Sequence, residues 1–96
     1  MTDSQIELCL QAQFIEYFER TPEEGECTIE FIEGSCAVIR LNVHSSEKKG
    51  VEDFLSLFLG SYDRYLNTPV RRYTKDRIKV TVEVFIPFTN FLKGLS

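Results

Sequence analysis

The segment from Arg77 to Ile86 constrains the fold most, because apolar and polar residues alternate along its whole length. A period of two is typical of a strand that buries one face and exposes the other. A strand of this kind needs neighbouring strands for its backbone and a covering layer for its apolar face. The chain must therefore contain a sheet with other elements packed against one side. The apolar positions are Ile78, Val80, Val82, Val84 and Ile86.

Residues 26–33 and 37–44 predict a hairpin. Both segments are rich in β-branched residues, which favour strands, and a short polar stretch separates them. A three-residue loop at 34–36 gathers the apolar side chains on one face and sets Glu30 opposite Arg40 on the other. A two-residue loop would bring glutamates into the apolar row, so we reject that register.

Two helices are predicted from spacings of three and four between apolar residues. The first runs to about Arg20 and begins with the capping-box pattern of Ser4 and Glu7. The second starts after Ser45 or Ser46 and continues to about Leu66. Its apolar stripe consists of Val51, Phe54, Leu55, Phe58, Leu59 and Tyr62, prolonged by Tyr65 and Leu66.

Residues 70–74 form a candidate partner strand that turns back through Lys75-Asp76, and 88–95 form a short helical turn or an edge segment. The element order is then α-β-β-α-(β)-β. We expect a single α+β domain over residues 1–96, with two helices on one face of a three- or four-stranded antiparallel sheet. Its other face would still carry Ile32, Val38 and Phe85, so contact with another chain is expected there, and a homodimer is one candidate.

The chain is too acidic overall for a generic nucleic-acid binder, with a formal charge of −4 over 96 residues. The charges are unevenly placed, however. Residues 1–60 hold four bases and twelve acids, a balance of −8, whereas residues 61–96 hold seven bases and three acids, a balance of +4. This polarity makes two charged surfaces the candidate binding sites.

The basic surface is predicted from Arg71, Arg72, Tyr73, Lys75 and Arg77. Guanidinium groups beside an aromatic ring can neutralise phosphates and stack a base, as single-stranded nucleic-acid binders do. Four alternatives stay open for this surface. It could pair with the acidic half of the same chain, pair head-to-tail with the acidic half of a second copy, bind a different acidic protein, or bind nucleic acid.

The acidic surface is predicted from Glu16, Glu19, Glu23, Glu24 and Glu26. In one version of its function, this surface occupies a basic site on a target protein. The other interpretation is a solvated acidic face with no partner.

The sequence offers little catalytic chemistry. A nucleophilic Cys would need His44 as its base, but Cys27 and His44 fall on opposite faces of the predicted hairpin. Three Cys and one His could supply zinc ligands, yet they lack the close paired spacing of such sites. We therefore expect no enzymatic activity, no metal and no cofactor.

Three cysteines without CxxC spacing favour a reducing compartment. The first apolar segment lacks the pattern of a secretory signal, and the longest strongly apolar window, Phe54 to Leu59, is too short for a bilayer. A soluble cytoplasmic protein is expected, with no membrane contact.

These features together predict a non-enzymatic protein-interaction module, in the manner of a small acidic inhibitor or immunity-type protein, although no motif carries that likeness. It would bind a macromolecular partner through complementary charge and an aromatic-rich surface. The alternative is a nucleic-acid binder that uses the basic segment from Arg71 to Lys79.

Overall fold

The structure is a computed structural model that describes residues 3–32, 36–60 and 66–85. The order of its helices and strands is α-β-β-α-β-β, which confirms the predicted α+β fold. The elements are α1 (Asp3–Phe18), β1 (Cys27–Ile32), β2 (Cys36–His44), the 3-10 turn η1 (Ser45–Glu47), α2 (Lys48–Asp53), the π-helical segment η2 (Phe54–Phe58), β3 (Val70–Tyr73) and β4 (Arg77–Val84).

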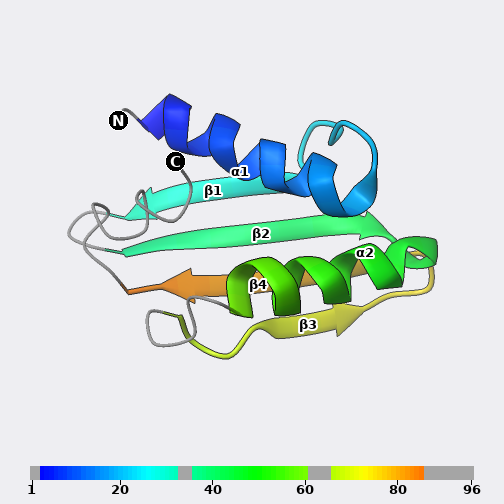
Figure 1. The fold of residues 1–96 in the computed structure, drawn as a ribbon. Coiled ribbons are helices and arrows are strands. Elements are labelled where there is room, and N and C mark those ends of the chain that lie inside the picture. The colour runs from blue at the N-terminus through cyan, green and yellow to red at the C-terminus, as the bar shows by residue number, and fades with distance from the viewer. Residues whose placement is uncertain (1–2, 33–35, 61–65, 86–96) are drawn as a thin grey trace.

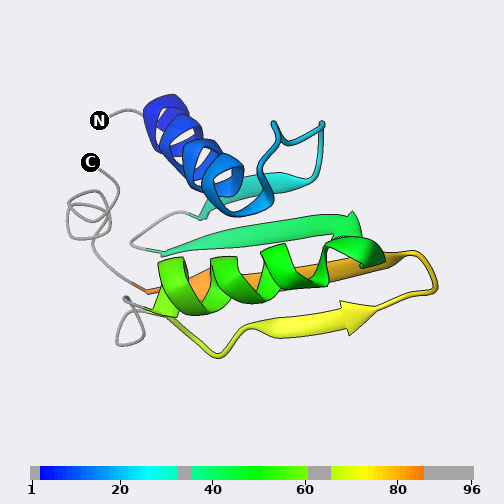
Figure 2. The same cartoon turned by 45° about the vertical axis from the view of Figure 1, so that its right-hand side comes forward.

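The four strands form one antiparallel sheet in the order β1-β2-β4-β3. The strand with the cleanest alternation, β4, is therefore central and has a neighbour on each side. Helices α1 and α2 lie on the same face of this sheet (Figures 1 and 2). The opposite face of the sheet, which we call the open face, carries neither helix.

The hydrophobic core lies between the helices and the covered face of the sheet. Every second residue of β4 contributes to it, and each of the four apolar side chains of that strand is 1% exposed. The larger buried side chains from the helices are Ile6, Leu10, Phe14, Val51, Phe54, Leu55, Phe58 and Leu59.

The first helix differs from its prediction at both ends. It begins at Asp3, so Ser4 lies inside the helix and is not its N-cap. It ends at Phe18, and Glu19 follows in the left-handed conformation with a φ of 58°. The Glu19 amide still donates to the Ile15 carbonyl at 2.9 Å. The left-handed residue stops the helix short of Arg20.

The second helix is also shorter than the apolar stripe predicts. α2 passes directly into η2, whose last residue is Phe58. Leu66 is not helical but forms an isolated β-bridge with Val84, and the Asn67 amide donates to the Glu83 carbonyl at 3.0 Å. Leu66 thus packs on the core from the segment that leads into β3. Its spacing from the preceding apolar residues fits a further helical turn equally well, so the sequence alone does not show this difference.

The hairpin register is displaced by two residues from the predicted one. Glu30 lies opposite Val38, and Arg40 lies opposite Thr28. A shift of two keeps every side chain on its predicted face, so the apolar row still faces the core. The predicted ion pair also forms, but on the diagonal, with 2.8 Å between Arg40 Nη1 and Glu30 Oε2.

Several predicted features lie outside the described residues. They are the segment 88–95, Ile86 at the end of the alternating strand, and Tyr62 and Tyr65 in the apolar stripe. Within the described ranges, no helix is long and apolar enough to cross a membrane.

Candidate interaction surface

The alternation of β3 divides the predicted basic surface between two faces of the sheet. Arg72 lies opposite Lys79 of β4 and shares the open face with it. Arg71 and Tyr73 lie opposite Val80 and Ile78, two core residues, and are on the helix side. Tyr73 is 58% exposed there. The predicted combination of an aromatic ring between neighbouring guanidinium groups is therefore not present on one surface.

Arg71 uses its charge within the molecule. Its Nε and Nη2 atoms lie 3.1 and 3.2 Å from the two carboxylate oxygens of Glu52. This two-point pair ties the edge strand β3 to α2. It stabilises the packing of the helix on the sheet and reduces the charge that Arg71 can offer to a partner.

Arg77 also has internal partners. Its Nε donates to Oδ1 of Asn42 at 2.9 Å, and its Nη2 donates to the Asn42 carbonyl at 2.7 Å. The same Nη2 lies 3.8 Å from Oε2 of Glu26. The predicted pairing of basic and acidic segments is thus observed in part. Lys75, in the exposed turn after β3, forms no ion pair with any described residue.

The open face brings together cations from three strands. Its strand neighbours form two rows, one of Thr28, Arg40 and Thr81 and the other of Asn42, Lys79 and Arg72. These six residues line a hollow of about 530 Å³. Three positive side chains and three uncharged polar ones therefore line one hollow, and their N–H and O–H groups could donate hydrogen bonds to an anionic group.

The charges around this hollow are only partly balanced. Arg40 pairs with Glu30 at 2.8 Å, in a geometry where both side chains are about half exposed. Arg72 and Lys79 form no ion pair with another described residue. A net positive charge remains, which would attract a negatively charged partner.

Sequence reasoning included Lys79 in the basic segment but missed Arg40. Arg40 lies far from the basic segment in the sequence. It comes close to Lys79 and Arg72 because β2 pairs with β4, which in turn pairs with β3. The available signal was the position of Arg40 on the polar side of an alternating strand. The strand order that brings the two segments together was not available from the sequence.

The predicted acidic surface contains four exposed glutamates and one buried one. Glu16, Glu19, Glu23 and Glu24 are exposed and form no ion pair with a described residue. Glu26 is 7% exposed. Its carboxylate therefore belongs to the interior of the molecule rather than to a surface for a partner.

Arg20 holds two acidic side chains together at one end of the sheet. Its guanidinium makes two hydrogen bonds to Glu26, at 2.6 and 2.9 Å, and two to Glu47, at 2.9 and 2.7 Å. It also lies 5.2 Å from the centre of the Phe14 ring. Hydrogen bonding to Glu47 and then to Glu26 raises the pKa of Arg20. Arg20 in turn lowers the pKa of Glu26 below its usual range.

This network is structural, because it joins η1 to the connection between α1 and β1, which carries both Arg20 and Glu26. The Glu26 carboxylate also accepts from the Glu23 amide at 2.7 Å, and its own carbonyl accepts from the Asn42 amide at 2.9 Å. Its hydrogen-bonding capacity is used by the chain itself. The lowered pKa of Glu26 is therefore explained by a structural ion pair. Functional groups can have similarly perturbed pKa values, so the shift alone does not mark a site.

The cysteines and His44 do not form a catalytic arrangement. Cys27 is 3% exposed on the covered face, whereas His44 is exposed. The Nδ1 atom of His44 accepts from the Ser46 amide at 3.1 Å and so caps η1. Burial, and then the charges of Glu7 and Glu26, raise the pKa of the Cys27 thiol to about 12. A thiol with this pKa is a poor nucleophile.

Within the described part of the chain, no group of three His, Cys, Asp or Glu side chains could hold a metal ion. Comparison of the chain with protein-family models, with curated proteins and with solved structures finds no match in any of the three.

Proposed function

We propose that this chain is a non-enzymatic interaction module that binds an acidic protein partner through the open face of its sheet. The observation that carries the proposal is the hollow of about 530 Å³ where Arg40, Arg72 and Lys79 meet. Two of these three cations lack an ion pair among the described residues. A partner carboxylate would gain hydrogen bonds there without displacing an internal one.

The rest of the open face supports a protein partner over nucleic acid. Next to the basic rows, Glu30 and Glu83 add negative charge, which would repel a continuous phosphate backbone. Ile32 and Phe85 are 44% and 52% exposed. A face with positive, negative and apolar regions is typical of protein interfaces, where the polar groups select the partner.

A charge-reversal pull-down tests the proposal. The tagged chain is compared with the double variant Arg72→Glu/Lys79→Glu in lysate from its native cell, with and without nuclease. The variant Lys48→Glu/Lys49→Glu has the same net charge and changes exposed positions on α2. It is the matched control.

We expect the open-face variant to lose its protein partner and the control variant to keep it. Nuclease treatment should change neither result. Equal recovery by the two variants would contradict the proposal. Loss of all bound material after nuclease treatment would favour the nucleic-acid alternative. A third variant, Glu23→Lys/Glu24→Lys, tests the version in which the acidic surface makes the contact, because only that version predicts a loss of binding from it.

A further inference from the structure

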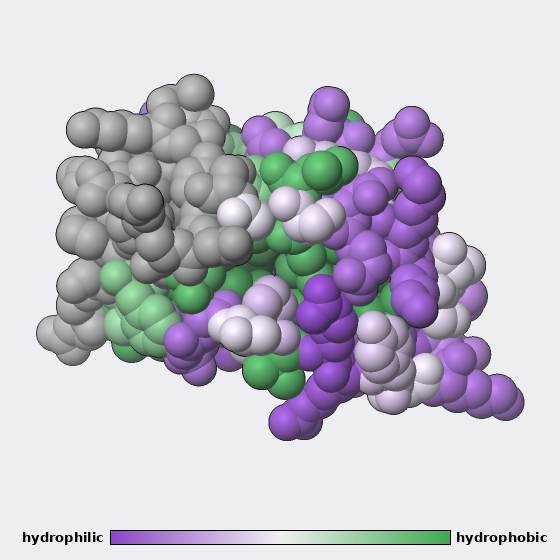
Figure 3. Space-filling view, turned by 60° about the horizontal axis from the view of Figure 1, so that its bottom comes forward, coloured by the Kyte–Doolittle hydropathy of each residue, from purple (hydrophilic) through white to green (hydrophobic). Residues whose placement is uncertain are grey.

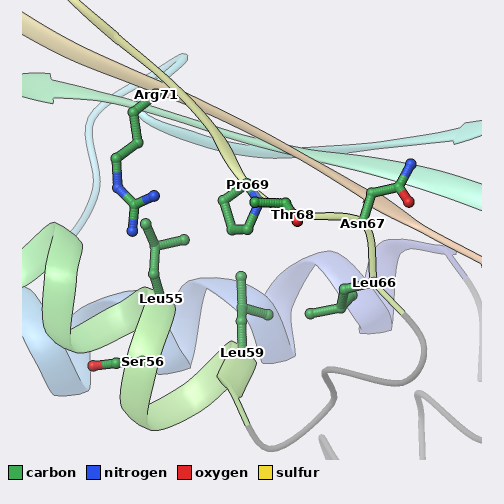
Figure 4. Close-up of a pocket in the computed structure, with 8 residues that line it drawn as sticks. All are labelled: Leu55, Ser56, Leu59, Leu66, Asn67, Thr68, Pro69 and Arg71. Atoms are coloured by element: carbon green, nitrogen blue, oxygen red, sulfur yellow. The ribbon is translucent and has the colours of Figure 1, made fainter.

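A second hollow lies between the helical segment and the edge strand of the sheet. It measures about 380 Å³. Leu55 and Leu59 rise from the helical segment on one side, and Pro69 and Arg71 lie on the other (Figure 4). Leu66 closes one end of it. The hollow therefore has an apolar floor, with Ser56, Asn67 and Thr68 as polar groups in its lining.

The helical segment has an unusual geometry at this place. Leu55 belongs to the π-helix η2, which replaces the regular α-helical hydrogen bonding from Phe54 to Phe58. Single π-helical turns are rare and frequently occur at functional sites. Figure 4 shows Leu55 pointing toward the hollow from this turn, while Phe54 and Phe58 remain in the core. Ser56 lies at the rim, and its hydroxyl donates to the Glu52 carbonyl at 2.7 Å.

Beside the hollow, β3 is an edge strand with all four of its residues exposed. Figure 3 brings this edge toward the viewer and shows hydrophobic residues in the middle of this side with hydrophilic residues at its right. An edge strand leaves one row of backbone N–H and C=O groups without strand partners. A groove between an edge strand and a helix is a setting in which domains add an extended peptide as a further strand.

A second copy of the chain is a poor occupant of this edge. Two β3 strands can pair antiparallel about a two-fold axis in two registers that match three of the four residues of each strand. One register places Arg71 opposite Arg71, and the other places Arg72 opposite Arg72. Like charges directly opposite each other destabilise a strand pair. Arg72 and Lys75 lack ion pairs with described residues, so the edge is complementary to an acidic strand.

We infer that β3 and the adjacent hollow receive an extended acidic segment of a protein partner, which adds to the sheet as a strand. One apolar side chain of this segment would enter the hollow and contact the partly exposed Leu66 and Pro69. This inference rests on the proposed function, because it names how the acidic partner binds. The acidic residues of the segment would approach Arg72 from the open face, and the apolar residue would point to the helix side.

Selection from a displayed library of random linear peptides on the immobilised whole chain tests this inference. We expect enrichment of peptides that lack Pro and carry one large apolar residue among Asp and Glu. N-methylation of the peptide backbone at alternate residues should weaken binding about tenfold or more, and methylation of the intervening residues should not, because a strand pairs every second amide with its neighbour.

Thr68→Trp fills the hollow from an exposed position on the strand side, and Leu57→Trp adds the same side chain at an exposed position outside the hollow. We expect the first variant to weaken peptide binding about tenfold or more and the second to leave it unchanged. If Thr68→Trp fails to fold by circular dichroism, Ser56→Trp obstructs the rim of the same hollow from the helical segment.

Three outcomes would overturn the inference: no enrichment, enrichment of basic peptides, or binding that is insensitive to Thr68→Trp and to backbone methylation. Peptides could bind without any effect of the Trp variant or of backbone methylation and still bind the Arg72→Glu/Lys79→Glu variant more weakly. That result would leave the proposed function in place. The failure of the strand-addition mode is thereby distinguished from the failure of acidic-partner binding.

Discussion

Gly50 packs directly against the ring of Phe18, because a Cβ atom on Gly50 would lie only 2.7 Å from Cδ2 and 2.9 Å from Cε2 of that ring. The ring cannot move away at low cost, since it stacks on Phe14 with 4.0 Å between the ring centres. We expect Gly50→Ala to lower the free energy of unfolding by about 1–3 kcal/mol, as overpacking of a filled contact does. Urea denaturation measures this change.

Gly60→Ala is the matched control for that substitution. Its Cβ would lie 3.6 Å from the Leu55 carbonyl oxygen, an ordinary contact, and its φ is outside the left-handed region. The added methyl group restricts the unfolded chain, so we expect stability to rise by up to about 1 kcal/mol. Equal destabilisation by the two alanines would show that the Phe18 ring is not the cause.

The Arg20 network should matter more to stability than any exposed ion pair. Arg20→Gln leaves the buried Glu26 without its charged partner, and we expect the free energy of unfolding to fall by about 2 kcal/mol. Arg40→Gln breaks an exposed pair with Glu30 and should cost less than about 1 kcal/mol. Chemical denaturation of both variants checks the order. A larger loss from Arg40→Gln would contradict the structural role of the network.

The stability of the chain should fall in acid partly because of Glu26. Its folded-state pKa lies below the unfolded value of about 4.3, since the ionised carboxylate is held by Arg20. The pair therefore stabilises the fold above that value, and this contribution is lost as the pH falls through the folded-state pKa. We expect the difference in stability between the wild type and Glu26→Gln to be largest near neutral pH and to shrink below about pH 5.

Denaturation curves at a series of pH values measure this difference. Glu24→Gln, at an exposed position, should follow the wild type at every pH. A gap between wild type and Glu26→Gln that stays constant down to about pH 3 would count against the ion pair as its source.

Cys27 should resist alkylation in the folded chain. Its thiol is buried with a pKa raised to about 12, so little thiolate forms even near pH 9. Cys9 and Cys36 are half-buried and should react first. Mass spectrometry after timed iodoacetamide treatment, with peptide mapping, checks the order. In denaturant all three should react, and rapid labelling of Cys27 without denaturant would show that its environment opens.

The sequence predicts the layers of this fold because its periodicities are strong. The alternation around Val80 and Val82 identifies a central strand, and the spacing of Phe54 and Phe58 identifies a covering helix. The hairpin register is less well determined, since a shift by two residues keeps each side chain on its face. The ion pair between Arg40 and Glu30 is compatible with both registers, so it does not distinguish them.

The binding surface is harder to predict than the layers. Arg71 and Arg72 are neighbours in sequence and so suggest one basic patch, but neighbouring residues of a strand point to opposite faces. Arg40 and Lys79 are distant in sequence and meet on the open face. The burial of Glu26 is equally hidden, because it depends on Arg20 reaching it from beyond the end of α1.

The pairing of β2 with β4 has a consequence for how the chain reaches its fold. Each of the hairpins β1–β2 and β3–β4 joins strands that are close in sequence, whereas the centre of the sheet joins Ala37 to Val84 and His44 to Arg77. Closing that long loop costs chain entropy before the contacts are made. We expect the two hairpins to form early and their docking along β2 and β4 to limit the rate of folding.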